Sequence, residues 1–342
     1  MARIPILSAA LAAFLAFGCA ADRPAAEPVG ETRQLLGTIC GVSIFDRPPA
    51  GVFDKVFARV KQIEQRMSVN LPDSEVSAVN AAAGRAPVAV SGETFDLIEK
   101  ALGYCEKSGG AFDISVGPLV KLWGIGTDAA RLPAPAEISA ALALVDHGRV
   151  KLDKAGRTVF LERPGMSLDL GAIAKGWAAD EAARLLKQAG VKGAIIDFGG
   201  NVMLVGRKPS GQPWRIGVQN PMDERGSYIG VVACQAEAVV TSGVYERWFE
   251  KDGKRYHHIL DTASGYPADN GLISVSIVAA ASTDADALST TVFALGLDKG
   301  RAFAAGLAGI GVIFVTAGRE VYLTPDLMKR FELTDSSFTL RN

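Results

Sequence analysis

The sequence predicts an α+β (mixed α/β) fold, formed by one large domain with mostly antiparallel strands and packed helices. Two patterns lead to this prediction. Apolar residues recur at helical spacing in several segments, whereas residues 214–278 consist of short strand-like runs separated by Gly, Asn and Pro turns. With 342 residues, 49% of them hydrophobic, the chain can bury a sizeable core. Helices mixed with many short strands are typical of this fold class.

The first half of the chain is predicted to contain a strand and two helices. Residues 38–45 alternate like a half-buried strand, and residues 53–67 place apolar side chains at the spacing of an amphipathic helix. A second helix is expected to start at Ser91, a favourable N-cap, and to end at the glycine pair 109–110. Residues 126–136 contain two prolines and are interpreted as a loop and a candidate subdomain seam.

The second half adds two helices and a buried strand. Residues 174–189 are rich in Ala and Leu and predict a helix that ends at the following glycine. Residues 194–198 predict a buried strand, which the glycine pair 199–200 interrupts. A last helix is predicted over residues 282–295, where Gly296 stops it.

The N-terminus is expected to carry an export signal. Residues 1–18 combine a basic start with a short apolar run, which is typical of a signal peptide. The run closes before Cys19 and resembles a bacterial lipobox, although Phe17 is bulky where a small residue is usual. We therefore expect residues 19–33 to be a lipidated cysteine and a tether, residues 34–342 to be the domain, and the protein to be anchored as a lipoprotein in the bacterial periplasm. Ordinary cleavage, leaving a soluble exported protein, is the alternative.

Composition excludes two classes of protein. The 36 Lys and Arg residues balance 37 Asp and Glu residues, and no basic run is present, which argues against a nucleic-acid-binding protein. Only the N-terminus approaches membrane-spanning length, so a polytopic membrane protein is excluded. Beyond Cys19, three widely spaced cysteines allow at most one disulfide, and we expect them to be small core residues.

The segment 282–291 is the most informative for chemistry. Asp286 and Thr290 are four residues apart, so on a helix their oxygens share one face, and Ser289 could add a third oxygen. Such hard oxygen ligands suit Mg²⁺. The alternative is that Asp284 and Asp286 cap the helix and favour the positive end of its dipole. Spacing alone favours the capping interpretation.

Other segments could line a ligand pocket. Lys175 follows a glycine-containing turn and could reach a phosphate at the start of a helix, although an ordinary surface lysine is the alternative. The turns 111–113 and 197–201 are further candidates. His257 and His258 are adjacent, so in a strand only one of them can face a given site. That histidine is either a general base or a structural residue.

Taken together, these segments resemble the ApbE family, the bacterial FAD:protein FMN transferases. The likeness runs from about Leu36 to Gly296, and its blocks occur in the family's order at Met67–Asn80, Gly110–Asp113, Asp169–Gly176, Gly199–Asn201, Thr241–Gly243, Tyr256–Ile259 and Ala285–Thr290. The resemblance implies an exported enzyme that uses Mg²⁺ and FAD, joins FMN to a threonine hydroxyl of an acceptor protein and releases AMP. It also implies that the acceptors are periplasmic FMN-binding proteins of electron-transfer complexes.

The resemblance further implies roles for individual residues. His258 matches the position expected for a catalytic base. Asp286, Thr290 and Ser289 match metal-ligand positions, and the backbone carbonyl of Ala172 is expected to complete the protein's share of ligands. The residues expected to contact FAD are Leu36, Asn70, Ala111, Phe112, Asp113, Asp169, Lys175 and Leu260.

One position departs from the family pattern and leaves the reaction open. Many relatives carry a tyrosine where this chain has Asn70, and an asparagine removes an aromatic surface that could pack on the flavin or adenine. Some family members hydrolyse FAD to FMN and AMP. A Mg²⁺-dependent FAD pyrophosphatase is therefore the first alternative, a non-catalytic FAD-binding lipoprotein the second, and a structural lipoprotein without flavin affinity the third.

Overall fold

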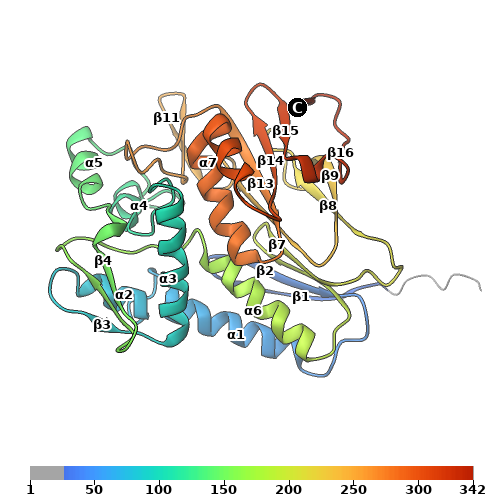
Figure 1. Cartoon of the computed structure of the whole chain (residues 1–342), viewed down its shortest axis with the longest axis horizontal. Coiled ribbons are helices and arrows are strands. Elements are labelled where there is room, and N and C mark those ends of the chain that lie inside the picture. The colour runs from blue at the N-terminus through green and yellow to red at the C-terminus, as the bar shows by residue number, and fades with distance from the viewer. Residues whose placement is uncertain (1–26, 342) are drawn as a thin grey trace, which may run out of the picture.

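A nine-stranded sheet forms the centre of the fold in residues 27–341, the part of the chain that the computed structural model describes (Figure 1). Neighbouring strands pair antiparallel, except for the last two, which are parallel. The predicted fold class, with mostly antiparallel strands, is therefore confirmed. Across the sheet the order is β1 (Val29–Leu35), β2 (Thr38–Ile44), β6 (Gly193–Phe198), β7 (Asn201–Gly206), β10 (Ala238–Gly243), β13 (Leu272–Ala279), β14 (Gly311–Thr316), β15 (Glu320–Leu323) and β17 (Thr339–Arg341).

Three helices cover one face of this sheet: α1 (Val52–Met67), α6 (Ala174–Gln188) and α7 (Ser282–Ala305) (Figure 1). Their apolar faces form one core with the inward-facing strand residues. In α1 the buried side chains recur three and four residues apart, as the sequence predicts for this helix. Burial of these side chains stabilises each helix far more than its local propensity does.

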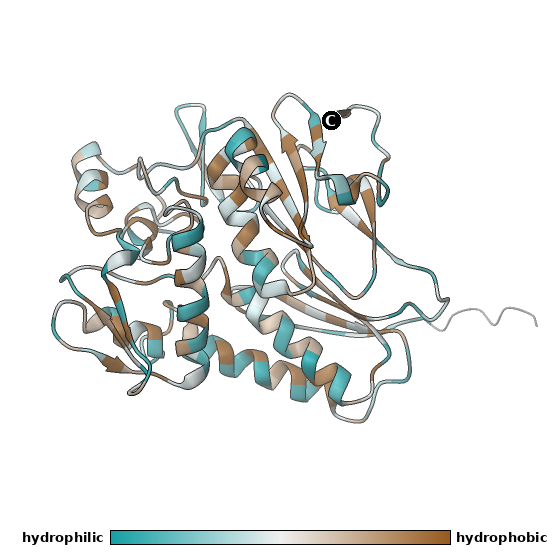
Figure 2. Ribbon diagram, in the orientation of Figure 1, coloured by the Kyte–Doolittle hydropathy of each residue, from teal (hydrophilic) through white to brown (hydrophobic). Residues whose placement is uncertain are grey.

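The opposite face of the sheet packs on a smaller sheet with the order β16 (Phe331–Leu333), β9 (Tyr228–Cys234) and β8 (Trp214–Gln219). Apolar side chains from both layers form a second core around Trp214 and Phe331, and a short 3-10 helix, η2 (Pro325–Leu327), adds Leu327 to it. Figure 2 shows hydrophobic residues along the packed strands of both layers. Because strands face a core on both sides of the large sheet, its central strands are apolar on both faces.

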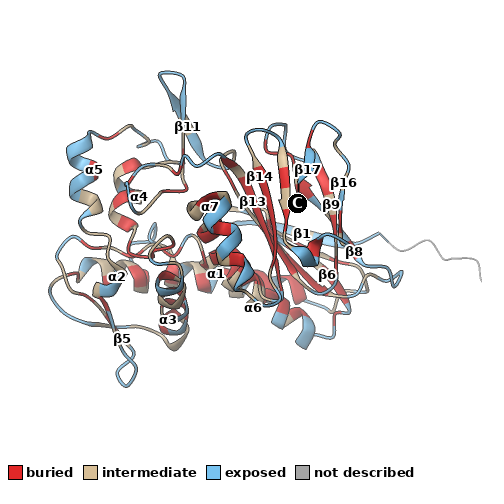
Figure 3. Cartoon of the chain, turned by 45° about the horizontal axis from the view of Figure 1, so that its top comes forward, coloured by how far each residue is buried: buried red, intermediate tan, exposed pale blue. Residues whose placement is uncertain are grey.

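A lobe beside the helical layer is formed by residues 75–161 (Figure 1). A hairpin, β11 (Trp248–Lys251) and β12 (Lys254–His257), projects from the molecule with an exposed tip (Figure 3). The hairpin ends where residue 258 begins the loop that returns to the lobe. The lobe's elements are α2 (Glu75–Ala81), β3 (Val88–Ala89), α3 (Gly92–Lys107), α4 (Gly117–Trp123), α5 (Pro135–Leu142), η1 (His147–Arg149), β4 (Val150–Asp153) and β5 (Thr158–Leu161).

Several local predictions are confirmed. The side chain of Ser91 accepts a hydrogen bond from the Thr94 amide and caps α3, and both glycines at 109–110 have positive φ where that helix has ended. Cys40, Cys105 and Cys234 are buried free thiols, as expected for core residues. Among residues 27–341, no helix is both long and apolar enough to cross a membrane. The predicted signal peptide and Cys19 lie outside the described residues.

One element boundary differs from prediction. Residues 29–33, expected to belong to the tether, pair with β2 as part of β1. At Gly296, where the last helix was predicted to stop, the backbone leaves helical geometry with φ 76° and ψ −178°, and after this kink a second helical segment continues α7 to Ala305. The Asn270 side chain donates to the Phe293 carbonyl at 2.7 Å, which satisfies an acceptor that the kink releases. The loop at 126–136 lies within the lobe, and α5 begins at Pro135.

Candidate active site

The site is built where the first turns of α6 and α7 cross. Gly176 lies against the backbone of Ser282, and a Cβ atom at position 176 would overlap the Ser282 carbonyl oxygen. Glycine is therefore required for this close approach. The crossing brings together two segments that are more than 100 residues apart in the sequence, and it places Lys175 beside Asp286.

At this crossing each helix caps the other. Asp180 of α6 accepts hydrogen bonds from the amides of Ser282 and Thr283, at 2.8 and 2.9 Å. In return, Asp286 of α7 accepts one from the amide of Gly176 at 2.9 Å. The first amides of a helix have no partner within the helix, so these bonds satisfy donors that would otherwise be buried and unpaired.

The interpretation of Asp284 and Asp286 as caps of their own helix is therefore wrong. The N-cap of α7 is Ala281, which has no side chain to accept a hydrogen bond, and its role is taken by the α6 carboxylate. Asp284 instead accepts from the Tyr104 hydroxyl at 2.8 Å and pairs with Lys100 at 2.6 Å. Asp286 faces the start of α6, so it is available to a site between the two helices.

Four oxygen-bearing residues gather at the α6–α7 crossing. The carboxylate of Asp286 is 4% exposed. The Ser289 hydroxyl donates to the Asp286 carbonyl at 2.9 Å, and the Ser242 hydroxyl of β10 lies 2.8 Å from Ser289 and 3.4 Å from Thr290. Ala172 lies in the turn directly before α6. The structure thus brings Ser289 and Thr290 together near Asp286, Ala172 is linked to the crossing through its place before α6, and the roles of all four as metal ligands stay predictions.

Lys175 places a positive charge on this oxygen cluster. Its ammonium nitrogen lies 3.1 Å from one carboxylate oxygen of Asp286 and 3.2 Å from the carbonyl oxygen of Gly171. The position therefore accommodates a cation between a carboxylate and a carbonyl oxygen. Oxygen donors of this kind are those that Mg²⁺ prefers, so the residues present fit that ion. The alternative of Lys175 as an ordinary surface lysine does not describe this partly buried ion pair.

Asp169 and the turn 111–113, both predicted to contact FAD, lie next to each other. The Asp169 amide donates to the Ile114 carbonyl at 2.8 Å, which places residue 169 beside the turn 111–113. The Asp169 carboxylate accepts from the Gly171 amide at 2.7 Å. Burial raises the pKa of Asp169, and this hydrogen bond together with the positive charges of Arg247 and Lys175 opposes the rise. The Thr262 hydroxyl also donates to the Gly110 carbonyl at 2.6 Å, which ties the loop of Leu260 to this turn.

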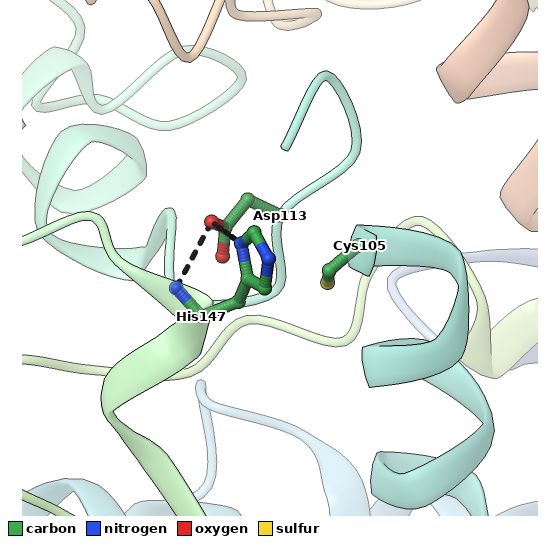
Figure 4. Close-up of side chains that lie close together, drawn as sticks. All are labelled: Cys105, Asp113 and His147. Atoms are coloured by element: carbon green, nitrogen blue, oxygen red, sulfur yellow. Dashed lines mark hydrogen bonds and ion pairs between the residues drawn. The ribbon is translucent and has the colours of Figure 1, made fainter. Parts of the chain in front are cut away.

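Within the turn 111–113, the Asp113 carboxylate is used for local hydrogen bonds (Figure 4). One oxygen accepts from the amide and hydroxyl of Ser115, at 2.8 and 2.6 Å, and the other from the amide and Nδ1 of His147, at 3.2 and 2.8 Å. The Cys105 sulfur lies close by, and one ligand atom from each of the three residues falls within 4.8 Å of the others. Burial raises the pKa of Cys105 to about 12, so it is a protonated thiol.

The Cys105–Asp113–His147 cluster is therefore a structural feature of the lobe rather than a magnesium site. Thiol and imidazole donors do not suit Mg²⁺, and four donors already satisfy the carboxylate. Asp113 holds the turn in place, so its expected contribution to FAD binding is to position the backbone of Ala111 and Phe112. Phe112 and Leu260 are themselves buried apolar residues.

The two adjacent histidines have different environments. Both ring nitrogens of His257 are used, since Nδ1 accepts from the Ile259 amide at 3.3 Å and Nε2 donates to the Ala268 carbonyl at 2.9 Å. In His258, Nδ1 lies 3.3 Å from the Arg247 carbonyl. That oxygen can only accept, so the Nδ1–H tautomer fits and Nε2 carries the free lone pair. Burial, followed by the positive charge of Arg247, lowers the pKa of His258 to about 3, so its imidazole is neutral at physiological pH.

Leu36 and Asn70 lie at the same end of α1. The Leu36 amide, at the tip of the β1–β2 hairpin, donates to the Glu64 carboxylate at 2.7 Å. The backbone N–H of Asn70 donates to the hydroxyl of Ser68, the residue after that helix, at 3.2 Å. Asn70 itself is exposed. Asn70 is therefore free to contact a ligand or water. A hollow of about 350 Å³ between β1 and α1 includes none of the predicted site residues.

Four residues at or near the site have no role predicted from the sequence: Ser242, Asp180, Glu64 and Arg247. Ser242 belongs to one of the matched blocks, Thr241–Gly243, and that block was the available signal. Asp180 ends the segment that contains Lys175, but its partners are a hundred residues away. Glu64 and Arg247 stand in segments without a distinctive motif, so only the folded arrangement reveals where they lie.

Comparison with known proteins agrees with this arrangement. The ApbE family model matches residues 36–314. The FAD:protein FMN transferase of Klebsiella pneumoniae (strain 342) is 44% identical over 304 residues, covering 89% of this chain and 94% of the relative. The FAD:protein FMN transferase of Treponema pallidum (strain Nichols) is 38% identical, with 94% of each chain covered. The crystal structure of the ApbE protein of Thermotoga maritima superposes with a TM-score of 0.81 at 33% identity, covering 88% of this chain and 98% of that one.

Proposed function

Because this chain belongs to the ApbE family, we propose that it is an FAD:protein FMN transferase, which moves FMN from FAD to a threonine hydroxyl of an acceptor protein and releases AMP. The observation that carries the proposal is the cluster at the α6–α7 crossing. There Lys175 pairs with the carboxylate of Asp286, and the Ser242 hydroxyl lies near those of Ser289 and Thr290, which follow Asp286 on the same helix. A cation held by this carboxylate would neutralise charge on a diphosphate.

Asp286 and Thr290 would hold Mg²⁺, with Ser289 and the carbonyl of Ala172 beside them. When bound, the ion neutralises negative charge on phosphate oxygens. The chain's own residues would do the remaining work. Lys175 can contact phosphate as a point charge, and the buried turn 111–113 with Leu260 can exclude water from the flavin dinucleotide.

His258 would take the proton of the incoming hydroxyl. The contact of Nδ1 with the Arg247 carbonyl leaves Nε2 with a free lone pair that can accept a proton. His257 cannot do the same, because both of its nitrogens are engaged by the backbone. This difference supports the choice of His258 as the catalytic base.

Hydrolysis is a second candidate function, and the exposed Asn70 is the observation that favours it. An aromatic residue at this place could cover the flavin, whereas an asparagine amide could orient a water molecule toward the phosphate. An FAD pyrophosphatase releases AMP without an acceptor protein, whereas a transferase needs one. A lipoprotein that only carries flavin keeps its FAD intact, and a structural lipoprotein does not bind FAD.

We further propose that the protein is an exported lipoprotein attached to the membrane through Cys19. The apolar N-terminal run and the cysteine that follows it support this proposal. Its acceptors would then be periplasmic proteins of electron-transfer complexes. Soluble export without the lipid is the alternative, and the mass of the mature N-terminus distinguishes the two.

The test mixes the purified protein with FAD, Mg²⁺ and an FMN-accepting domain, and follows both AMP release and the mass of the acceptor. A transferase adds one FMN to a threonine of the acceptor, and AMP appears only when the acceptor is present. AMP release that is independent of acceptor would establish hydrolysis instead. Intact FAD in every mixture would contradict both enzymatic proposals. An acceptor whose threonine is replaced by alanine serves as the control.

A further inference from the structure

We infer that Arg247 is an additional substrate-binding residue, whose guanidinium contacts the diphosphate of FAD. The inference rests on the proposed function and adds to it a residue that neither motif nor spacing indicated. Arg247 lies on the chain between β10 and β11, one residue before the projecting hairpin.

Three segments fix the position of Arg247. Its carbonyl oxygen accepts a hydrogen bond from the His258 amide at 3.1 Å, so its backbone pairs with the predicted catalytic residue. Its Nη2 lies 3.5 Å from the carbonyl oxygen of Gly37, next to the predicted FAD-contacting Leu36. Its side-chain stem packs against Gly126, where an added Cβ would lie 3.0 Å from the arginine Cδ. The guanidinium is thus held at the edge of the predicted flavin site.

The Arg247 guanidinium forms no ion pair with another described residue. Among residues 27–341, no carboxylate lies within the 4.0 Å ion-pair distance of its guanidinium, whereas the adjacent Glu246 pairs with Arg225 at 2.7 Å. Lys175, the other cation of the site, already pairs with Asp286. Of the two cations of the site, Arg247 is therefore the one without an ion-pair partner in the part of the chain that the structure describes.

The positive charge of Arg247 also acts on His258 and Asp169. It lowers the pKa of both His258 and Asp169, so the guanidinium lies within electrostatic range of the predicted base and of a predicted FAD contact. A planar guanidinium can donate two parallel hydrogen bonds to phosphate oxygens. The diphosphate of a flavin dinucleotide supplies such oxygens, whereas riboflavin carries no phosphate.

The experiment compares ligands that differ in phosphate content. Flavin fluorescence titrations measure the affinity of the wild-type protein, Arg247→Gln and Arg247→Lys for FAD, FMN and riboflavin. The matched control is Arg255→Gln, since Arg255 is an exposed arginine on the neighbouring hairpin that packs over the ring of Trp248 at 4.1 Å. Loss of a charge-assisted pair is expected to weaken FAD binding by Arg247→Gln about 10- to 100-fold. Riboflavin affinity should not change.

The FAD affinity of Arg247→Lys should lie between those of the wild type and Arg247→Gln, because lysine keeps the charge but loses the paired donors. The salt dependence of FAD binding should also weaken in Arg247→Gln. An unchanged FAD affinity in Arg247→Gln would overturn the inference, and so would equal losses for FAD and riboflavin, which indicate a structural role. These measurements need binding only. If the wild-type protein binds FAD but transfers no FMN, the proposed function fails while the assignment of Arg247 is still decided.

Discussion

Two regions of the molecule each bury an aspartate beside a nitrogen-containing side chain, but the two carboxylates differ in how firmly their partners are fixed. In the lobe, Asp113 accepts four hydrogen bonds from Ser115 and His147, two of them from backbone amides. At the helix crossing, Asp286 accepts one bond from a backbone amide and otherwise pairs with the flexible ammonium of Lys175. The first carboxylate cannot change partners without unfolding its turn, whereas the second can exchange a lysine for another cation. Burial alone therefore does not distinguish the two aspartates, and the proposed metal site uses the one whose partner is a flexible side chain.

The largest effect is expected from Asp286→Asn. The amide keeps an oxygen that can accept from Gly176, but it loses the charge that a divalent cation requires. AMP release should fall at least about 1000-fold, since metal stabilisation of the transition state is worth several kcal/mol. FAD binding should persist more weakly, as it should in Asp286→Ala. Titration of AMP release with Mg²⁺ measures the loss, and undiminished turnover would remove Asp286 from the metal site.

Asp113→Ala tests the other half of the comparison. It leaves the donors of Ser115 and His147 without their acceptor in a buried place, so the free energy of unfolding should fall by about 3 kcal/mol. Urea unfolding followed by circular dichroism measures this change. Mg²⁺ affinity should not change, because this carboxylate is not a ligand. A stable variant with lost Mg²⁺ affinity would reverse the assignment of the two aspartates.

Lys175→Met tests whether the partner of Asp286 is replaceable. Without FAD, the ammonium competes with a divalent cation for the same carboxylate, so its removal should raise Mg²⁺ affinity about 10-fold. FAD affinity should fall in the same variant, because a phosphate contact is lost. Calorimetric titration with Mg²⁺ alone gives the result, and Lys187→Met, an exposed position of the same helix, is the control. Unchanged Mg²⁺ affinity would mean that the lysine does not compete for the position.

The last prediction concerns His258, which faces the cation Arg247, whereas His147 of the lobe faces a carboxylate. The folded-state pKa of His258, about 3, lies below its ordinary value of about 6.5. The unfolded chain therefore binds the proton more readily, and the stability contributed by neutral His258 is complete above about pH 6.5 and is lost toward pH 3. His258→Gln should reduce the fall in the free energy of unfolding across this range. Equal pH dependence in both proteins would contradict the lowered pKa.

Patterns with a strong local cause could be predicted from the sequence. The amphipathic spacing of α1 and the cap at Ser91 depend on neighbours within a few residues. The break at Gly296 was predicted, but the helical segment that follows it was not, because Asn270 from another loop supports the kink. The strand formed by residues 29–33 was also not predicted, because they carry no alternating apolar pattern, and five of the seven β1 residues are exposed.

In the candidate site too, local features could be predicted from the sequence, whereas features that depend on distant segments could not. The Asp286–Thr290 spacing could be predicted, because it depends on one helix. Whether the α7 aspartates cap their own helix could not be predicted, because the acceptor for the first amides of α7 is Asp180 of a different helix. The position of the Arg247 guanidinium likewise depends on contacts with the hairpin tip at Gly37 and with the loop at Gly126.

The mutual capping of α6 and α7 has a consequence for the order in which the protein matures. Neither helix start is complete until the other has docked, and the docking partners are contributed by segments on either side of residue 200. A nascent chain that has not yet produced residue 286 lacks both the carboxylate of the site and the acceptor for the Gly176 amide. Binding of any ligand that needs the Asp286 carboxylate must therefore follow synthesis of the chain through residue 286 and cannot begin on a shorter fragment.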